Sequence, residues 1–241
     1  MKKHFILIFV VVLTTLFFIK TDSDAASLTG KATYEGEIPK FKAIRMEADP
    51  VCLAKHSGEV LPETLVLGDE TSKTLGNVLV RITSGLPSKT YPTPPEPFVL
   101  TQEGCRYSPH VIAVMVGQPV KFLNPDGTLH NLHALPKMNE EFNMAMPQFR
   151  KEATKTFDKV EVAPFPIKCD VHPWMGAWVS VMNHPFFSVT PPNGLYKIDN
   201  LPAGTYEVEA WHEKLPAQKA TVTLAEGETK EINFTFSKPS Q

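Results

Sequence analysis

Proline is the residue that most restricts how this chain can fold. The sequence contains 22 prolines among its 241 residues. Because proline has no backbone N–H to donate, it is excluded from helix interiors and central strands and collects in turns and at edges. Few segments have apolar residues at the spacing of a helix, whereas short alternating runs are common. We therefore predict an all-β architecture with many turns.

The first residues resemble an export signal. Lys2 and Lys3 precede an apolar run from Phe5 to Ile19 that only two threonines interrupt. This run is short for a membrane span and typical of a signal peptide, and Ser23-Asp24-Ala25 supplies the small residues of a cleavage site. We predict a signal peptide over residues 1–25, a periplasmic or otherwise extracytoplasmic location, and no membrane span after cleavage. An uncleaved N-terminal anchor is the alternative.

The charge balance argues against nucleic acid as a partner. The formal net charge is −2, and no run of lysines and arginines would follow a phosphate backbone.

Clusters of proline and changes in strand pattern divide the remaining chain. The expected parts are an N-terminal β segment (26–86), a proline-rich connection (87–97), a central β domain (98–184) and a C-terminal β domain (185–237). Asp49-Pro50 resembles the start of a short helix that ends near Gly58 and carries Cys52.

Three sulfur and nitrogen ligands occur within seven residues of the central domain. Cys169-Asp-Val-His172-Pro-Trp-Met175 has the spacing Cys-x2-His-x2-Met. Two histidines and one cysteine in a plane, with a weak axial methionine, make a blue-copper site. The second histidine is expected to be His130, which follows a predicted strand. A strand end and a hairpin loop would hold these four side chains rigidly.

Other interpretations of these residues remain open. An isolated cysteine or methionine is often a buried structural residue, and zinc also accepts cysteine and histidine, although it rarely takes a thioether. His133 is expected to face away and form an ordinary hydrogen bond. Met144-Ala-Met146 is either a thioether site for Cu(I) or part of the core.

Residues 97–183 resemble a cupredoxin of the amicyanin and plastocyanin type. The resemblance is carried by the Cys-x2-His-Pro-aromatic-Met loop and by Gly117-Gln-Pro-Val-Lys-Phe-Leu-Asn-Pro-Asp ahead of His130-Asn131. It implies one type 1 copper ion. The implied ligands are His130, Cys169, His172 and Met175. It also implies that the amide of Asn131 ties the two ligand-bearing segments together.

The ligand loop differs from amicyanin-like loops at one position. Those loops often carry proline before the histidine, whereas this chain has Val171, whose N–H could reach the sulfur of Cys169. His172 is expected to be the exit for electrons, with Trp174 and Pro173 as a possible docking patch.

The remaining cysteines and histidines are not assigned to the metal. Cys52 and Cys105 are expected to form a disulfide in an oxidising compartment. Four further histidines lack ligand spacing and are expected to be surface or satisfied core residues; they are His56, His110, His184 and His212.

The C-terminal segment resembles a carboxypeptidase regulatory-like (transthyretin-like) β-sandwich. Residues 206–210 and 232–236 alternate as half-exposed strands do, and the pattern Leu-Pro-x-Gly-x-Tyr-x-Val begins at Leu201. The strands that usually open such a domain occur far upstream, at Gly30–Glu35 and Asn77–Val80. We therefore expect the two ends of the chain to form one sandwich with the cupredoxin inserted.

The combined pattern predicts a one-electron carrier and not an enzyme. Multicopper oxidases flank the copper-binding cysteine with histidines, whereas Cys169 lies between Lys168 and Asp170. The expected partner is a redox protein such as a c-type cytochrome or a dehydrogenase. Two alternatives are a periplasmic copper carrier or sequestration protein and a β-sandwich interaction module with a structural metal.

Overall fold

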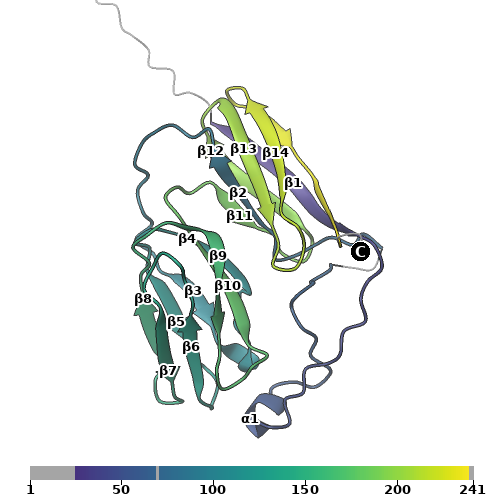
Figure 1. The fold of residues 1–241 in the computed structure, drawn as a ribbon, viewed down its shortest axis with the longest axis vertical. Coiled ribbons are helices and arrows are strands. Elements are labelled where there is room, and N and C mark those ends of the chain that lie inside the picture. The colour runs from purple at the N-terminus through teal and green to yellow at the C-terminus, as the bar shows by residue number, and fades with distance from the viewer. Residues whose placement is uncertain (1–24, 69–70, 239–241) are drawn as a thin grey trace, which may run out of the picture.

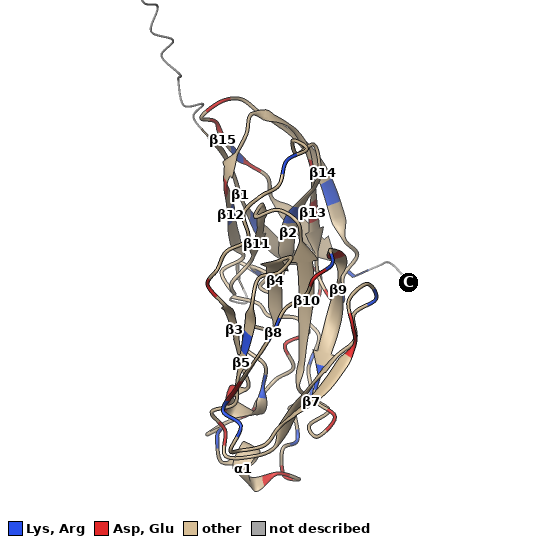
Figure 2. Ribbon diagram, turned by 90° about the vertical axis from the view of Figure 1, so that its left-hand side faces the viewer, with Lys and Arg blue, Asp and Glu red and all other residues tan. Residues whose placement is uncertain are grey.

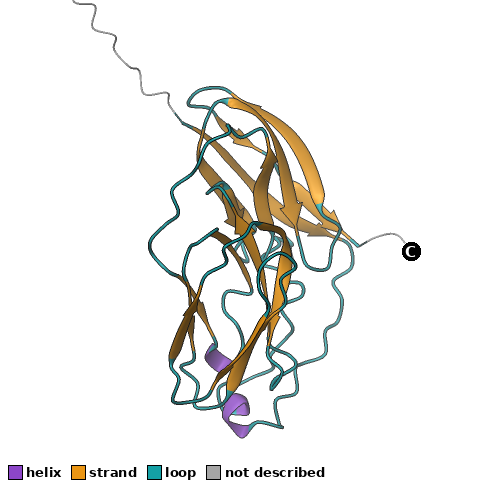
Figure 3. Ribbon diagram, turned by 60° about the vertical axis from the view of Figure 1, so that its left-hand side comes forward, coloured by secondary structure: helices purple, strands orange, loops and turns teal. Residues whose placement is uncertain are grey.

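The structure is a computed structural model that describes residues 25–68 and 71–238. The expected signal peptide therefore lies outside the described residues, apart from Ala25. Within the described ranges no helix is long and apolar enough to span a membrane. Almost all regular structure is strand, which confirms the predicted all-β fold. The described helices are short, α1 (Pro50–Leu53) and η1 (Glu103–Cys105), and the helical segments in Figure 3 lie at the lower end of the molecule.

The strands form two stacked sandwiches (Figure 1). The upper one, here called the terminal sandwich, has two sheets with the orders β12-β1-β15, in which β16 also pairs with β1, and β11-β2-β13-β14. Its strands are β1 (Ala26–Glu35), β2 (Leu79–Ser84), β11 (Phe187–Val189), β12 (Leu195–Leu201), β13 (Gly204–Trp211), β14 (Gln218–Leu224), β15 (Thr229–Glu231) and β16 (Phe234–Ser237).

The lower sandwich, here called the inserted sandwich, lies between β2 and β11 in the sequence. Its sheets have the orders β4-β10-β9-β6-β7 and β3-β5-β8. Its strands are β3 (Phe98–Thr101), β4 (Val111–Met115), β5 (Val120–Leu123), β6 (His130–Ala134), β7 (Phe142–Met146), β8 (Glu152–Lys155), β9 (Glu161–Lys168) and β10 (Gly176–Met182).

The two ends of the chain pair in the terminal sandwich, as expected. Strand β1 runs antiparallel to β12 and parallel to β15 and β16, and β2 pairs with β13. Gly30 allows this packing, because a Cβ there would overlap the carbonyl oxygen of Ile232. Side chains of both chain ends fill one hydrophobic core, which is separate from the core of the inserted sandwich.

One part of the N-terminal segment belongs to the inserted sandwich instead. Met46, Cys52 and Val60 are buried in the same cluster as the central strands, with Ile44 packed against it. Figure 1 shows this stretch leaving β1 and running down to α1 at the far end of the molecule. We call residues 41–64 the covering segment. The predicted disulfide between Cys52 and Cys105 is the one sequence signal for this position, because the segment has no strand that pairs with a neighbour.

The two sandwiches meet through an apolar cluster and a buried arginine. Trp178 of β10 packs edge-on against Trp211 of β13, with ring centroids 5.4 Å apart. Arg81 of β2 is only 4% exposed, pairs with Glu209 and donates to the carbonyl of Val162 in β9. In Figure 2 basic and acidic residues are interspersed along both sandwiches.

Removal of Arg81 should loosen this junction. Arg81→Ala removes the buried cation that pairs with Glu209 and donates to the Val162 carbonyl, and loss of one member of a buried pair costs roughly 3 kcal/mol. We expect a lower urea midpoint by circular dichroism. The matched control is Lys121→Met, which breaks the exposed pair with Glu152 and should cost under about 1 kcal/mol. Equal midpoints for the two variants would contradict a stabilising role for Arg81.

Candidate metal centre

The loop with the Cys-His-Met spacing connects two strands in the middle of the large sheet. Strands β9 and β10 pair antiparallel, with Lys168 opposite Gly176, so residues 169–175 form the hairpin loop between them. The N–H of Cys169 donates to the carbonyl of Met175 at 3.2 Å, and the N–H of Met175 donates to the carbonyl of His172 at 2.9 Å. The loop is therefore closed by its own backbone.

His130 is brought to this loop by the neighbouring strand. It is the first residue of β6, which pairs with β9 so that His133 lies opposite Lys168. Asn131 joins the two segments, because its Oδ1 accepts from the N–H of Asp170 at 2.6 Å. Its Nδ2 donates to Asn143 at 2.6 Å. Asn131 thus occupies the tying position that the cupredoxin resemblance implies.

Three ligand atoms converge inside the protein. The imidazole nitrogens of His130 and His172 and the sulfur of Cys169 lie within 4.8 Å of one another, and all three residues are buried. The two Nδ1 atoms are 3.0 Å apart, and the sulfur is 3.8 Å from Nδ1 of His172. Met175 is 2% exposed and belongs to the same hydrophobic cluster as Cys169.

The outer nitrogen of each imidazole faces a carboxylate. Nε2 of His172 donates to Oδ2 of Asp49 at 2.9 Å, and Nε2 of His130 donates to Oδ2 of Asp126 at 3.1 Å. An ionised carboxylate only accepts hydrogen bonds, so both Nε2 atoms carry the proton. Both Nδ1 lone pairs then point at the same place, which favours a cation between them. With a thiolate and a buried thioether, this donor set fits copper.

The cysteine sulfur is held ready to ionise. Burial alone would raise the pKa of the Cys169 thiol, but the neighbouring imidazole of His130 and the backbone N–H groups of Asn131, His172 and Val171 lower it below its usual value. The His172 N–H lies 3.4 Å from the sulfur. A thiolate is the form that binds a metal, so this environment favours metal binding.

The covering segment closes the outer side of the site. The predicted disulfide between Cys52 and Cys105 is confirmed and joins this segment to the loop after β3. The sulfur of Cys52 lies 3.5 Å from Nε2 of His172, and His172 is only 2% exposed. His172 was expected to be the exit for electrons. Its outer imidazole edge is instead covered by Asp49 and the disulfide.

The two residues of the expected docking patch lie beside His172. The ring of Trp174 is 5.0 Å from the imidazole of His172, and its Nε1 donates to the carbonyl of Cys105 at 3.0 Å. Trp174 is half-buried and Pro173 is exposed. Trp174 therefore reaches from the candidate ligand toward solvent.

His133 does not join the ligands. It lies on the outer side of β6, where Nδ1 is 2.9 Å from Asp170 and Nε2 is 3.2 Å from Glu141. These carboxylates raise the pKa of His133. Met144 and Met146 both point into the core from β7, and Met146 is fully buried, so their burial favours a packing role.

The remaining histidines are distributed over both sandwiches. His56 bonds to the carbonyl of Gly104, His110 contacts Glu213 at 2.5 Å, and His184 accepts from the N–H of Phe186. His212 differs, because its Nε2 is buried without a hydrogen-bond partner and burial lowers its pKa to about 4.

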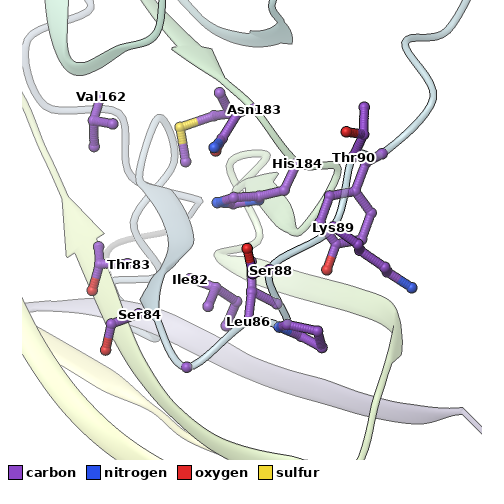
Figure 4. A pocket seen from close by; sticks show the side chains of 14 residues that line it. Ile82, Thr83, Ser84, Leu86, Ser88, Lys89, Thr90, Val162, Asn183 and His184 are labelled. Atoms are coloured by element: carbon purple, nitrogen blue, oxygen red, sulfur yellow. The ribbon is translucent and has the colours of Figure 1, made fainter.

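A separate pocket lies at the opposite end of β10 from the ligand loop. Its volume is about 570 Å³, and it lies where the proline-rich connection passes between the sandwiches (Figure 4). His184, Ser88 and Thr83 are among its lining residues. A seven-residue strand separates it from the loop by roughly 20 Å, so it plays no part in the candidate metal centre.

Two residues of the site were missed from the sequence. Asp49 was interpreted only as a helix cap, a role that it also has, since it accepts from the N–H groups of Val51 and Cys52. Asp126 stands four residues before His130 in an Asn-Pro-Asp-Gly turn. That proximity was a usable signal for Asp126. Asp49 lies 123 residues from His172, and no local pattern connects them.

Among solved structures, part of the chain is similar to cupredoxins, at low TM-scores. No protein-family model and no curated protein match it. A Cu(I) methionine-to-alanine mutant of amicyanin matches at 20% identity, 43% of this chain, 98% of that chain and a TM-score of 0.32. A Cu-containing nitrite reductase from Thermus scotoductus SA-01 matches at 20% identity with a TM-score of 0.34. The match covers 42% of this chain and 26% of that chain. A purple cupredoxin from Nitrosopumilus maritimus matches at 20% identity with a TM-score of 0.30. The match covers 35% of this chain and 99% of that chain.

These matches are too distant to carry a functional conclusion. Each covers less than half of this chain, which itself spans only about a quarter of the nitrite reductase. They give no support to the resemblance between the terminal sandwich and carboxypeptidase regulatory-like domains. The case for copper therefore depends on the side chains that converge in this structure.

Val171→Pro tests whether the N–H of Val171 acts on the sulfur of Cys169. Proline removes the N–H, so the thiolate keeps more electron density for the metal, which favours Cu(II). We expect a lower reduction potential in cyclic voltammetry and an almost unchanged visible band. Val171→Ala retains the N–H and is the control. An unchanged or higher potential in Val171→Pro would show that this N–H does not reach the sulfur.

Proposed function

We propose that this protein is an exported type 1 copper protein that transfers one electron at a time. The observation that carries the proposal is the convergence of His130, Cys169 and His172 on one buried point, with Nε2 of each imidazole facing a carboxylate and Met175 in the same buried cluster as Cys169. Copper, when bound, supplies a one-electron couple between Cu(I) and Cu(II).

The way the ligands are supported favours electron transfer. His130 begins a paired strand, and Cys169 and His172 belong to a loop that its own backbone closes. Ligands that keep their positions in both oxidation states lower the reorganisation that an electron transfer requires. Within the described residues, all groups of histidine, cysteine and carboxylate that could hold a metal include His130 or His172. This supports a single copper and a carrier rather than an oxidase.

The proposed route for the electron passes through the side of the loop that remains accessible. Since Asp49 and the disulfide cover the outer edge of His172, we place the docking patch at Trp174 and Pro173. The ring of Trp174 contacts His172 and is partly exposed. The proposed partner is an extracytoplasmic redox protein such as a c-type cytochrome or a dehydrogenase.

Loading the mature protein with Cu(II) tests the proposal. We expect an intense visible band from charge transfer between thiolate and copper, together with a reversible one-electron wave. Cys169→Ser should abolish the band and keep the circular dichroism of the fold, because the sheets do not depend on that sulfur.

The matched control is His133→Ala, which changes a nearby histidine outside the ligand set and should keep the band. Loss of colour in His133→Ala but not in Cys169→Ser would show that the ligands are assigned wrongly. A colourless Cu(II) adduct that does not cycle would favour a copper carrier or sequestration protein. A protein that takes zinc in preference to copper would favour a structural metal in an interaction module.

A further inference from the structure

Nε2 of each imidazole, in His130 and in His172, donates to a carboxylate that other residues hold in place. Asp126 is fully buried and accepts from the N–H groups of Gly104 at 3.1 Å and Cys105 at 2.7 Å. Lys55 lies 3.0 Å from its other side. These contacts leave the carboxylate no freedom to turn away from His130, so the orientation of that imidazole is set by η1.

Asp49 is fixed in a similar way by α1. Its Oδ1 accepts from Val51 at 2.9 Å, while its Oδ2 accepts from the hydroxyl of Thr128 at 2.9 Å and from Nε2 of His172. Thr128 lies two residues before His130. Asp49 therefore connects the covering segment to both histidine-bearing segments. Asp126 also pairs with the cation of Lys55, whereas no lysine or arginine of the described residues pairs with Asp49.

Carboxylates in these positions act on a metal through the imidazole. A carboxylate that accepts the Nε2 proton fixes the tautomer and makes Nδ1 a stronger donor. Its negative charge also favours the more positive oxidation state of a nearby metal ion. Two such carboxylates on the two histidines of one site add their effects in the same direction.

We propose that Asp49 and Asp126 are positioning residues of the copper site, which orient His172 and His130 and lower the reduction potential that the same four ligands would otherwise give. This inference rests on the proposed function. It assigns a role to the covering segment, which brings one of the two charges, and to Lys55, which offsets the other.

Charge-neutral substitutions test the effect on the potential. Asp49→Asn and Asp126→Asn keep an oxygen that accepts from Nε2 and remove the charge, so each should raise the reduction potential of the copper-loaded protein. Lys55→Gln removes the cation beside Asp126 and should shift the potential the opposite way. The control is Asp158→Asn, an exposed carboxylate beyond the far end of β9, which should leave the potential unchanged. Unchanged reduction potentials in both Asp49→Asn and Asp126→Asn would overturn the inference.

The metal-free protein gives an independent readout of orientation. By nuclear magnetic resonance, the Nε2 protons of His130 and His172 should be visible and slow to exchange with solvent. Asp49→Leu should make the His172 proton exchange faster without affecting that of His130, and should weaken copper binding about 10- to 100-fold. Slow exchange that persists in Asp49→Leu would overturn the positioning role.

The two sets of measurements separate this inference from the proposed function. A wild-type protein without the visible band and the reversible wave contradicts the proposed function, and the exchange of the Nε2 protons still tests the pairing. If the wild type shows the visible band and the reversible wave, but Asp49→Asn and Asp126→Asn both have its reduction potential, only the inference is contradicted. Asp126→Asn keeps one oxygen, which can accept from His130 and Cys105 but not also from Gly104. If this variant unfolds, Asp49→Asn carries the test, because Asp49 is partly exposed.

Discussion

The hydrogen bonds of Asn131 hold the candidate site together. Its side chain accepts from the backbone of Asp170 and donates to Asn143, and its carbonyl accepts from the buried hydroxyl of Tyr107. Its own N–H is one of the groups that lower the pKa of the Cys169 thiol. One residue therefore fixes the distance between the strand that carries His130 and the loop that carries the other ligands. If this spacing changed, the three donor atoms would no longer meet.

The two sandwiches support this spacing from different sides. The large sheet of the inserted sandwich places β6, β9 and β10 in register, while β4 pairs along the other edge of β10. The far side of the same sheet packs on the terminal sandwich through Trp178 and Trp211. Because the inserted sandwich leaves the terminal one after β2 and returns at β11, both of its ends are held by paired strands. The candidate metal centre lies at the end remote from these attachments.

Local patterns in the sequence were sufficient for part of this structure. The alternation of apolar residues predicted the strands, and the spacing of Cys169, His172 and Met175 predicted their loop. The pairing of β1 with the C-terminal strands was also predicted, because parts of the carboxypeptidase regulatory-like sequence pattern occur at both ends of the chain. The position of the covering segment and the contact of Asp49 with His172 were not predicted. Both depend on contacts between residues far apart in the sequence, 79 residues for Asp49 with Thr128 and 123 for Asp49 with His172, and neither leaves a periodic signal.

The disulfide also determines which donor atoms the site can offer. Cys52 and Cys105 each stand within reach of one of the two imidazoles and of a carboxylate, in groupings that would suit a metal if their sulfurs were free. A reduced chain would present three thiols around two histidines, a soft set that binds several metals. Oxidation withdraws two of these sulfurs and leaves Cys169 as the single free cysteine in the described residues. A chain that is oxidised before it meets a metal therefore offers one thiolate at this site, whereas a reduced chain offers three thiols.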